Sequence, residues 1–196
     1  MKFKIFKYNK VANTNKTAIE LIKKKKIDKG FVYALSQKKG TGRYGRKWVS
    51  KKGNFFGSIF FPLKKNFPSI NEFTLINPML NIDVLSKHCG ENNLFFKSPN
   101  DIYINKKKIC GILQETILRE SKRYLIVGIG INILSSPKIK NYPITNLYAE
   151  TKKKIKLTKI VNEIKNKYEY FFSHLNLYSF LSFKIKSKKL LLDQIK

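Results

Sequence analysis

Consecutive strand-like runs in the middle of the chain constrain its fold more than any other feature. Residues 101–104 and 108–118 are apolar or alternating runs separated by the polar turn 105–107, and the β-branched run 124–134 follows shortly after. Closely spaced runs of this kind form antiparallel hairpins. Four further runs predict strands, namely 2–9, 31–37, 54–63 and 94–97. Strands outnumber helices, so we expect an α+β fold with a mixed β-sheet and flanking helices.

Helical patterns occupy three of the other segments. Residues 14–26 carry apolar side chains at helical spacing, with Thr14 or Asn15 placed to cap the first turn. Residues 157–172 place apolar side chains on one face of a predicted helix. Residues 176–196 predict a last helix with a lysine-rich end.

A fourth helix is predicted to run to about Cys89. Ser69 followed by Glu72 is a capping-box sequence that marks its start. Pro78 lies inside this segment, lacks an N–H and crowds the preceding turn. We therefore expect a kink at Pro78, or a new helix that starts there with Asn77 as its cap.

Length and composition indicate one folded domain of 196 residues. The chain has no apolar run long enough to span a bilayer, and its first residues lack the apolar core of a signal peptide. We therefore expect a cytoplasmic protein without membrane association. Cys89 and Cys110 are too few for a disulfide framework and are expected to be reduced core residues. His88 and His174 lack metal-ligand spacing, so no metal site made by the protein alone is expected.

The net charge of +29 raises a different possibility, a non-catalytic protein that binds nucleic acid. Only four of the 41 basic residues are arginine, however, and the lysines are spread along the chain. Lysine, asparagine, isoleucine and phenylalanine all have A/T-rich codons, so a genome-wide base bias gives the same composition. We therefore favour a solvated basic surface without specific nucleic-acid binding, which still attracts acidic partner proteins.

The sequence GTGRYGRKW, residues 40–48, is the most unusual segment. It contains three glycines, two of the four arginines and the only tryptophan. Glycine lets backbone amides approach a ligand closely, and guanidinium groups match phosphate or carboxylate with paired hydrogen bonds. These residues predict a loop that closes over an anion rather than a flexible surface loop.

Two further segments carry unusual chemistry. KSPND at 97–101 is followed by KICGIL at 108–113, and the predicted hairpin brings Asp101 near Lys108. An inward-facing lysine is costly to bury without an anionic ligand. VGIGIN at 127–132 lacks the third glycine and the following helix of a dinucleotide fingerprint. Glycines inside a strand nevertheless indicate close approach of a ligand or of another backbone.

Together these segments resemble the biotin protein ligase family. The family's phosphate-binding loop, G-R/T-G-R-x-G-R-x-W, is matched by Gly40–Trp48. Its K-W-P-N-D signature and the K-x-x-G-I-L that follows are matched by Lys97–Asp101 and Lys108–Leu113. Its G-I-G-I-N is matched by Gly128–Asn132, and its S-T-N by the sequence N-T-N at 13–15.

The order and spacing of these motifs agree with the family across about residues 1–172. The resemblance implies that residues 1–196 form a single catalytic domain with the biotin/lipoate protein ligase-like fold, which is related to class II synthetases. We expect no helix-turn-helix domain before residue 1, and therefore no repressor role like that of some relatives. Little β pattern follows Leu157, so we expect the SH3-like C-terminal domain of many relatives to be absent or truncated.

The resemblance implies an enzyme that attaches biotin to acetyl-CoA carboxylase with the use of ATP. Such ligases join the carboxylate of biotin to the α-phosphate of ATP, with Mg²⁺, and release pyrophosphate. They then transfer biotin from biotinyl-5′-AMP to one lysine of a biotin carboxyl carrier protein. They act as monomers or homodimers.

The resemblance also assigns roles to individual residues. Lys108, Arg43 and Asp101 are implied to be catalytic: Lys108 between the carboxylate and the phosphate, Arg43 on the α-phosphate, and Asp101 orienting an amine or helping to hold Mg²⁺. The implied biotin-binding residues are Asn13, Thr14, Asn15, Gln37, Thr41, Gly42, Arg43, Lys108 and Gly111, the last leaving room for the biotin ring. The implied ATP- and adenylate-binding residues are Gly40, Arg43, Arg46, Trp48, Asn100 and Asn132.

Two residues depart from the family's pattern. Ser98 replaces the tryptophan of K-W-P-N-D and removes a packing surface, and Asn13 replaces the serine of S-T-N and alters one expected hydrogen bond to biotin. The nearest alternative enzyme is a lipoate or octanoate ligase or transferase. That class shares the fold and the catalytic lysine but lacks the G-R-x-G-R-x-W form of the loop.

Overall fold

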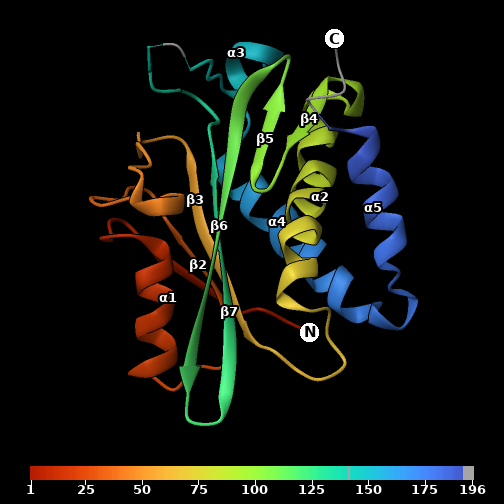
Figure 1. Ribbon diagram of the computed structural model, residues 1–196. Helices are drawn as coiled ribbons and strands as arrows, with labels where there is room; N and C mark the ends of the chain where they lie inside the picture. Colours follow the sequence, from red (N-terminus) through yellow and green to blue (C-terminus); the bar gives the residue numbers. More distant parts are fainter. Residues whose placement is uncertain (141, 192–196) are drawn as a thin grey trace.

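A mixed β-sheet runs through the centre of the computed structural model, which describes residues 1–140 and 142–191 (Figure 1). The strand order is β1-β2-β3-β7-β6-β5-β4. The strands are β1 (Ile5–Tyr8), β2 (Gly30–Ala34), β3 (Phe55–Pro62), β4 (Leu94–Lys97), β5 (Asp101–Ile104), β6 (Lys107–Arg119) and β7 (Lys122–Ile131). β1 is parallel to β2 and the other neighbouring strands are antiparallel, which confirms the predicted mixed sheet.

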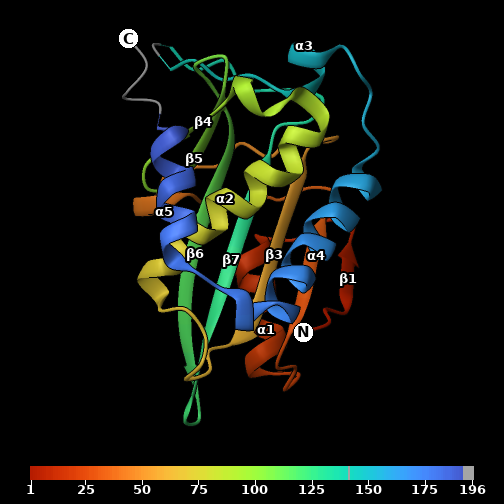
Figure 2. The ribbon, with the colours of Figure 1, turned by 90° about the vertical axis from the view of Figure 1, so that its right-hand side faces the viewer.

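Helices cover both faces of the sheet (Figures 1 and 2). The helices are α1 (Thr14–Lys23), α2 (Ile70–Cys89), α3 (Leu147–Thr151), α4 (Leu157–Ser173) and α5 (Phe180–Lys189), with 3₁₀ turns η1 (Arg43–Gly45), η2 (Glu91–Asn93) and η3 (Leu175–Leu177). α1 lies on one face, while α2 and α4 pack on the other and α5 packs against α2. The expected α+β class is confirmed.

Apolar clusters on the two faces hold the sheet between the helices. On the α2 and α4 face, Phe61 packs against Phe73 and Phe172 with ring centroids 5.6 and 4.7 Å apart. On the α1 face, the buried cluster consists of Ala18, Leu21, Ile22, Val32, Phe60, Tyr124 and Ile126. The second cluster is small and leaves the rest of the α1 face open for a pocket.

The pairing of β6 with β7 decides which face carries glycine. Side chains alternate between the faces of a strand. Val127, Ile129 and Ile131 therefore point into the larger core, while Gly128 and Gly130 face the opposite side. Gly130 lies directly across from Gly111 of β6. The strands therefore carry no side chains of their own on the α1 face at these three glycines.

The start of α1 differs from the expectation. Asn13, rather than Thr14 or Asn15, caps the helix, because its Oδ1 accepts a hydrogen bond of 2.8 Å from the Lys16 N–H. The helix ends at Lys23 rather than at Lys26, with Lys24 as its C-cap and Lys26 at a positive φ of 56°.

α2 continues through Pro78, so the alternative of a new helix with Asn77 as its cap is wrong. Asn77 is buried inside the helix, where its Oδ1 accepts from the Tyr168 hydroxyl at 2.9 Å and its amide donates to Gln114 at 2.5 Å. The capping box of Ser69 and Glu72 is present as predicted.

The later segments are partly as expected. The predicted helix at 157–172 is confirmed as α4, and the last predicted helix appears as α5, with residues 192–196 outside the described part. A short helix that the sequence did not reveal, α3, begins near the end of the polar segment 135–150 and is capped by the Asn146 side chain.

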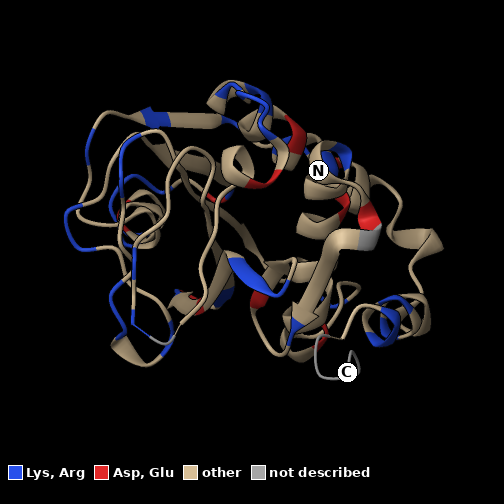
Figure 3. Cartoon of the chain, turned by 90° about the horizontal axis from the view of Figure 1, so that it is seen from above, with Lys and Arg blue, Asp and Glu red and all other residues tan. Residues whose placement is uncertain are grey.

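The cysteines follow the sequence-based expectation in part. Cys110 is a buried core residue, whereas Cys89 is only partly buried at the edge of the core. Both are free thiols, and burial raises the pKa of Cys89 to about 11. Basic residues are distributed over many elements rather than gathered on one (Figure 3). Within the described ranges, no helix is long and apolar enough to cross a membrane.

Candidate active site

A pocket of about 460 Å³ opens on the α1 face, above the glycines of β6 and β7. This volume suits a small organic ligand. All of the residues proposed above as site residues line it, with the exception of Gly40. Seven further lining residues belong to the motifs of the sequence analysis but had no individual role there: Tyr44, Lys47, Ile112, Leu113, Gly128, Ile129 and Gly130. The lining residues outside those motifs are Val49, Pro137, Ile139, Tyr142 and Ile144.

Glycines form the pocket floor, and the indole of Trp48 packs directly on them. A Cβ added at Gly111 would lie 2.7 Å from Trp48 Cζ3, and one at Gly130 would lie 2.5 Å from Trp48 Cε2. Only glycine therefore accommodates the ring at these two positions. The place over Gly111 that the resemblance assigns to the biotin ring is taken by Trp48 here, so a ligand at that position has to displace the indole or lie beside it.

The glycine- and arginine-rich loop 40–48 folds back on itself. Trp48 N–H donates to the Gly40 carbonyl at 2.9 Å, and Gly42 N–H donates to the Arg46 carbonyl at 2.7 Å. A Cβ at Gly40 would lie 2.6 Å from the Trp48 carbonyl oxygen, so this closure requires glycine. The loop thereby holds Trp48 over the sheet.

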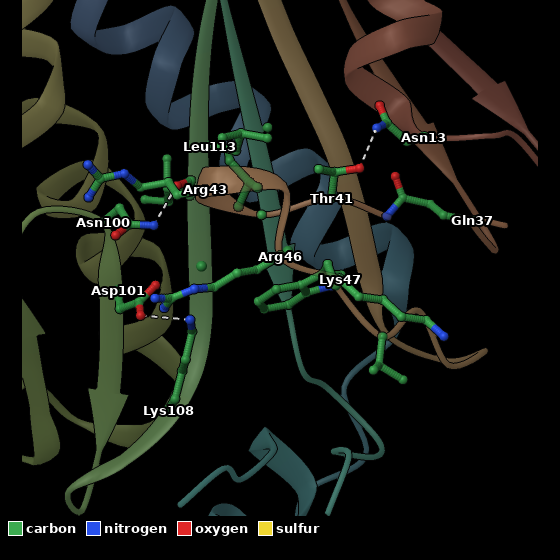
Figure 4. A pocket seen from close by; sticks show the side chains of 18 of the residues that line it. Asn13, Gln37, Thr41, Arg43, Arg46, Lys47, Asn100, Asp101, Lys108 and Leu113 are labelled. Atoms are coloured by element: carbon green, nitrogen blue, oxygen red, sulfur yellow. Dashed lines mark hydrogen bonds and ion pairs between the residues drawn. The ribbon is translucent and has the colours of Figure 1, made fainter. Parts of the chain in front are cut away.

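Asn13 ties this loop to α1. Besides capping the helix, it donates from Nδ2 to Thr41 Oγ1 at 3.2 Å (Figure 4). Both ends of its amide group are therefore bonded within the protein. The residue that departs from the family's serine thus links the loop to the start of α1.

The two loop arginines have different surroundings. The Arg43 guanidinium lies 4.9 Å from the centre of the Tyr44 ring and donates to the Tyr44 hydroxyl at 3.0 Å. Arg46 is exposed and extends across the pocket toward Asp101 and Lys108 (Figure 4). Asp101 is the one carboxylate among the lining residues, against four basic side chains, so the pocket attracts anions.

Lys108 and Asp101 form an ion pair, as the predicted hairpin implied. Lys108 Nζ lies 2.6 Å from Asp101 Oδ2, with the side chains 16% and 15% exposed (Figure 4). A register shift between β5 and β6 places Lys108 opposite Tyr103 and Gly111 opposite Asp101. Such bulges redirect side chains. The ammonium also lies 5.6 Å from the centre of the Trp48 ring.

Polar side chains close the α1 end of the pocket. Gln37 Oε1 accepts from the Thr14 N–H at 2.8 Å, and Gln37 Nε2 donates to Ser50 at 3.0 Å. Asn15 Nδ2 donates to Glu115 Oε2 at 2.6 Å. These contacts fix the orientation of the Gln37 and Asn15 side chains.

Asn100 and Asn132 make different hydrogen bonds with their side-chain amides. The Asn100 side-chain amide donates to the Ile112 carbonyl at 3.0 Å and so braces β6. Asn132 Nδ2 donates to the Thr145 carbonyl at 3.0 Å, while its Oδ1 is buried without a hydrogen-bond partner.

Three buried polar atoms without a hydrogen-bond partner lie in this pocket: Trp48 Nε1, Asp101 Oδ1 and Asn132 Oδ1. Buried polar groups are almost always paired in folded proteins. One donor and two acceptors among the lining residues therefore have unused hydrogen-bonding capacity. Among residues 1–140 and 142–191, no group of three His, Cys, Asp or Glu side chains is placed to hold a metal ion.

Comparison with known proteins agrees with this geometry. Residues 8–132 match the Biotin/lipoate A/B protein ligase family. A biotin–acetyl-CoA-carboxylase ligase of Paracoccus denitrificans is 30% identical over 131 residues, which are 65% of this chain and 55% of the relative. The bifunctional ligase/repressor BirA of Bacillus subtilis is 35% identical over 133 residues, 65% of this chain and 39% of the relative. The chain thus spans about half or less of these relatives.

Solved structures show the same fold. The biotin protein ligase of Aquifex aeolicus in complex with biotin and ATP aligns with a TM-score of 0.80 and 28% identity, over 96% of this chain and 78% of that one. The Leishmania major biotin protein ligase in complex with biotinyl-5-AMP aligns with a TM-score of 0.84 and 23% identity, over 98% and 83% of the two chains. The biotin/lipoate ligase fold expected from the sequence is confirmed.

Proposed function

Because the chain belongs to the Biotin/lipoate A/B protein ligase family, we propose that it is a biotin protein ligase that acts through an acyl-adenylate. A carboxylate oxygen of biotin attacks the α-phosphorus of ATP, the bond to the β-phosphate oxygen breaks, and pyrophosphate leaves. An acceptor lysine amine then attacks the carbonyl carbon of biotinyl-AMP, AMP leaves with the bonding electrons, and the amine loses its proton.

The observation that carries this proposal is the meeting of four separate motifs around one basic pocket. Residues from 13–15, 40–48, 97–101 with 108–113, and 128–132 all line it. The two substrates are both anions, so their approach needs positive charge to offset repulsion. A pocket with four basic side chains and one carboxylate supplies that charge.

Lys108 is proposed to stabilise the charge that develops between the two substrates. Its side chain is largely buried beside Asp101 and lies next to the indole of Trp48. A preorganised cation in a water-poor site lowers the barrier more than one in bulk water. Asp101 holds the ammonium in place before the substrates arrive.

The glycine- and arginine-rich loop is proposed to hold the phosphates. Arg46 already extends into the pocket (Figure 4), and Arg43 reaches a phosphate by leaving the Tyr44 ring. Guanidinium groups bind phosphate through paired, charge-assisted hydrogen bonds. Trp48 Nε1 and Asn132 Oδ1 are proposed to contact the adenylate, since both are buried and without a hydrogen-bond partner. Closure of this loop keeps water from the mixed anhydride.

Mg²⁺ is proposed to enter with ATP rather than to reside in the protein. Asp101 Oδ1, buried and without a hydrogen-bond partner, is a fitting oxygen ligand. The described residues provide no further acidic ligands around it, so the phosphates have to supply the rest of the coordination. When bound, the ion neutralises phosphate charge.

The proposed acceptor is a lysine of the biotin carboxyl carrier protein of acetyl-CoA carboxylase, and the proposed compartment is the cytoplasm. The name of the Paracoccus relative supports the choice of carboxylase. The basic surface suits an acidic carrier domain.

Incubation with ATP and Mg²⁺ and, separately, biotin, lipoate or octanoate tests the proposal. Mass spectrometry of the reaction is expected to detect biotinyl-AMP and no adenylate of the other two acids. Formation of lipoyl-AMP or octanoyl-AMP instead would reassign the chain to the other branch of the family. Formation of no adenylate contradicts the proposal.

A further inference from the structure

Tyr142 lies against the Lys108–Asp101 pair, although no sequence motif indicated it. Its hydroxyl donates to Asp101 Oδ2 at 3.4 Å, and its ring centre lies 5.8 Å from Lys108 Nζ. It belongs to the segment that follows β7, and it lines the pocket. A residue distant in sequence thus contacts both members of the ion pair.

The backbone beside Tyr142 is bonded to Lys108 itself. The Lys108 N–H donates to the Pro143 carbonyl at 2.9 Å, and the Thr145 N–H donates to the Lys108 carbonyl at 2.9 Å. The Tyr142 hydroxyl also lies 3.1 Å from the Tyr103 hydroxyl. The position of the ring over the ammonium is therefore set by the strand that carries the lysine.

Asp101 Oδ2 accepts hydrogen bonds from two donors, one charged and one neutral. During the proposed reaction the ammonium of Lys108 has to move toward the substrate oxygens. A half-buried carboxylate that loses its only donor is destabilised. The Tyr142 hydroxyl stays hydrogen-bonded to Asp101 when Lys108 moves away, so the carboxylate keeps one donor during the movement.

Two aromatic rings border the ammonium, that of Trp48 at 5.6 Å and that of Tyr142 at 5.8 Å. An aromatic face attracts a cation electrostatically, and more strongly where water is excluded. Trp48 is carried by the loop expected to move with substrate, whereas Tyr142 is attached to β6. The Tyr142 ring is therefore the fixed one of the two.

We propose that Tyr142 is a positioning residue for the adenylation step, an inference that rests on the proposed function. Its hydroxyl keeps Asp101 hydrogen-bonded while Lys108 moves to the reacting oxygens, and its ring restricts where the ammonium goes. It acts through Lys108 and Asp101 and does not itself exchange a proton with substrate.

Tyr142→Phe removes the hydroxyl and keeps the ring, and Tyr142→Leu removes both. Tyr148 in α3 is the matched control, because it is 40% exposed against 37% for Tyr142 and does not line the pocket. Trp48 is the only tryptophan, so its fluorescence reports binding of biotin and ATP independently of turnover. Single-turnover formation of biotinyl-AMP measures the chemical step.

We expect Tyr142→Phe to slow the single-turnover step about fivefold to tenfold and Tyr142→Leu to slow it by roughly a further fivefold, with dissociation constants within about twofold of wild type. Tyr148→Phe and Tyr148→Leu should match the wild type in the single-turnover rate and in the dissociation constants. Retention of the melting temperature in Tyr142→Phe separates this effect from unfolding.

Wild-type rates in both Tyr142 variants overturn the assignment while leaving the proposed function intact. Loss of binding by the same factor as loss of rate also overturns it, because Tyr142 then contributes to substrate affinity and not to positioning. A wild-type chain that forms no biotinyl-AMP overturns the proposed function itself, and the role of Tyr142 with it.

Discussion

Replacing Lys108 with alanine is expected to stop adenylate formation and also to lower stability. The Nζ–Oδ2 distance to Asp101 is 2.6 Å and both side chains are largely buried. Without the ammonium, Asp101 keeps only the weak hydrogen bond from Tyr142 at 3.4 Å on Oδ2, and its Oδ1 already lacks a hydrogen-bond partner. The variant therefore leaves a poorly compensated carboxylate in the pocket.

The magnitude follows from this geometry. A hydrogen bond to a charged group contributes about 1.5–3 kcal/mol, and each kcal/mol moves the melting temperature of a chain of this size by about 2–4 °C. Lys108→Ala should thus melt roughly 3–12 °C below the wild type. The double variant Lys108→Ala, Asp101→Asn lacks the uncompensated charge and should recover part of the lost melting temperature.

Thermal melting and biotin-dependent pyrophosphate release are measured on the same preparations. We expect release to fall at least about 100-fold in Lys108→Ala, as for other groups that stabilise charge in a transition state. Lys107→Ala is the control, since the neighbouring Lys107 side chain is 50% exposed and pairs with Glu150 at 3.4 Å. An unchanged melting temperature in Lys108→Ala refutes the buried pair, and an unchanged release rate removes Lys108 from the reaction centre.

Three further predictions concern the loop, the pocket floor and a distant carboxylate. Gly130→Ala should push Trp48 off the sheet, so the emission of this single tryptophan shifts to longer wavelength; an unshifted spectrum contradicts the packing described. Arg43→Ala should still form biotinyl-AMP but release it into solution, and an intermediate held as tightly as in the wild type excludes Arg43 as its phosphate ligand. The hydrogen bond from Tyr124 lowers the pKa of Asp28 in the folded protein. The ionised Asp28 therefore stabilises the fold at pH values above the usual aspartate pKa of about 3.9, and this stabilisation is lost as the pH falls through the lower pKa of the folded state. Asp28→Asn should therefore melt below the wild type at neutral pH and match it in strong acid, and an equal difference at both pH values contradicts this.

Motif spacing predicted most of the pocket because its chemistry depends on local sequence. Gly40 and Trp48 have to lie close for the loop to close, and Lys108 reaches Asp101 only across a short hairpin. Such requirements leave fixed spacings in the chain. The roles that the resemblance assigns to each residue stay predictions.

The parts that the sequence missed depend on packing between distant segments. Tyr142 contacts the ion pair only because backbone bonds attach its segment to β6 at Lys108. The second role of Asn13, holding Thr41, required the loop's position to be known. The predicted helix start at Asn77 was wrong for a related reason. The Asn77 side chain bonds to Tyr168 and Gln114 in other elements, and so it does not cap a new helix.

The central claim, that a carboxylate oxygen attacks the α-phosphorus of ATP in this pocket, is tested most directly by following that oxygen. Biotin labelled with heavy oxygen in its carboxylate is incubated with the protein, ATP, Mg²⁺ and a carrier domain, and the AMP is analysed by mass spectrometry. The proposed adenylate predicts that one labelled oxygen passes into each AMP, and that Lys108→Ala abolishes this transfer. Biotinylated carrier accompanied by unlabelled AMP would contradict the account.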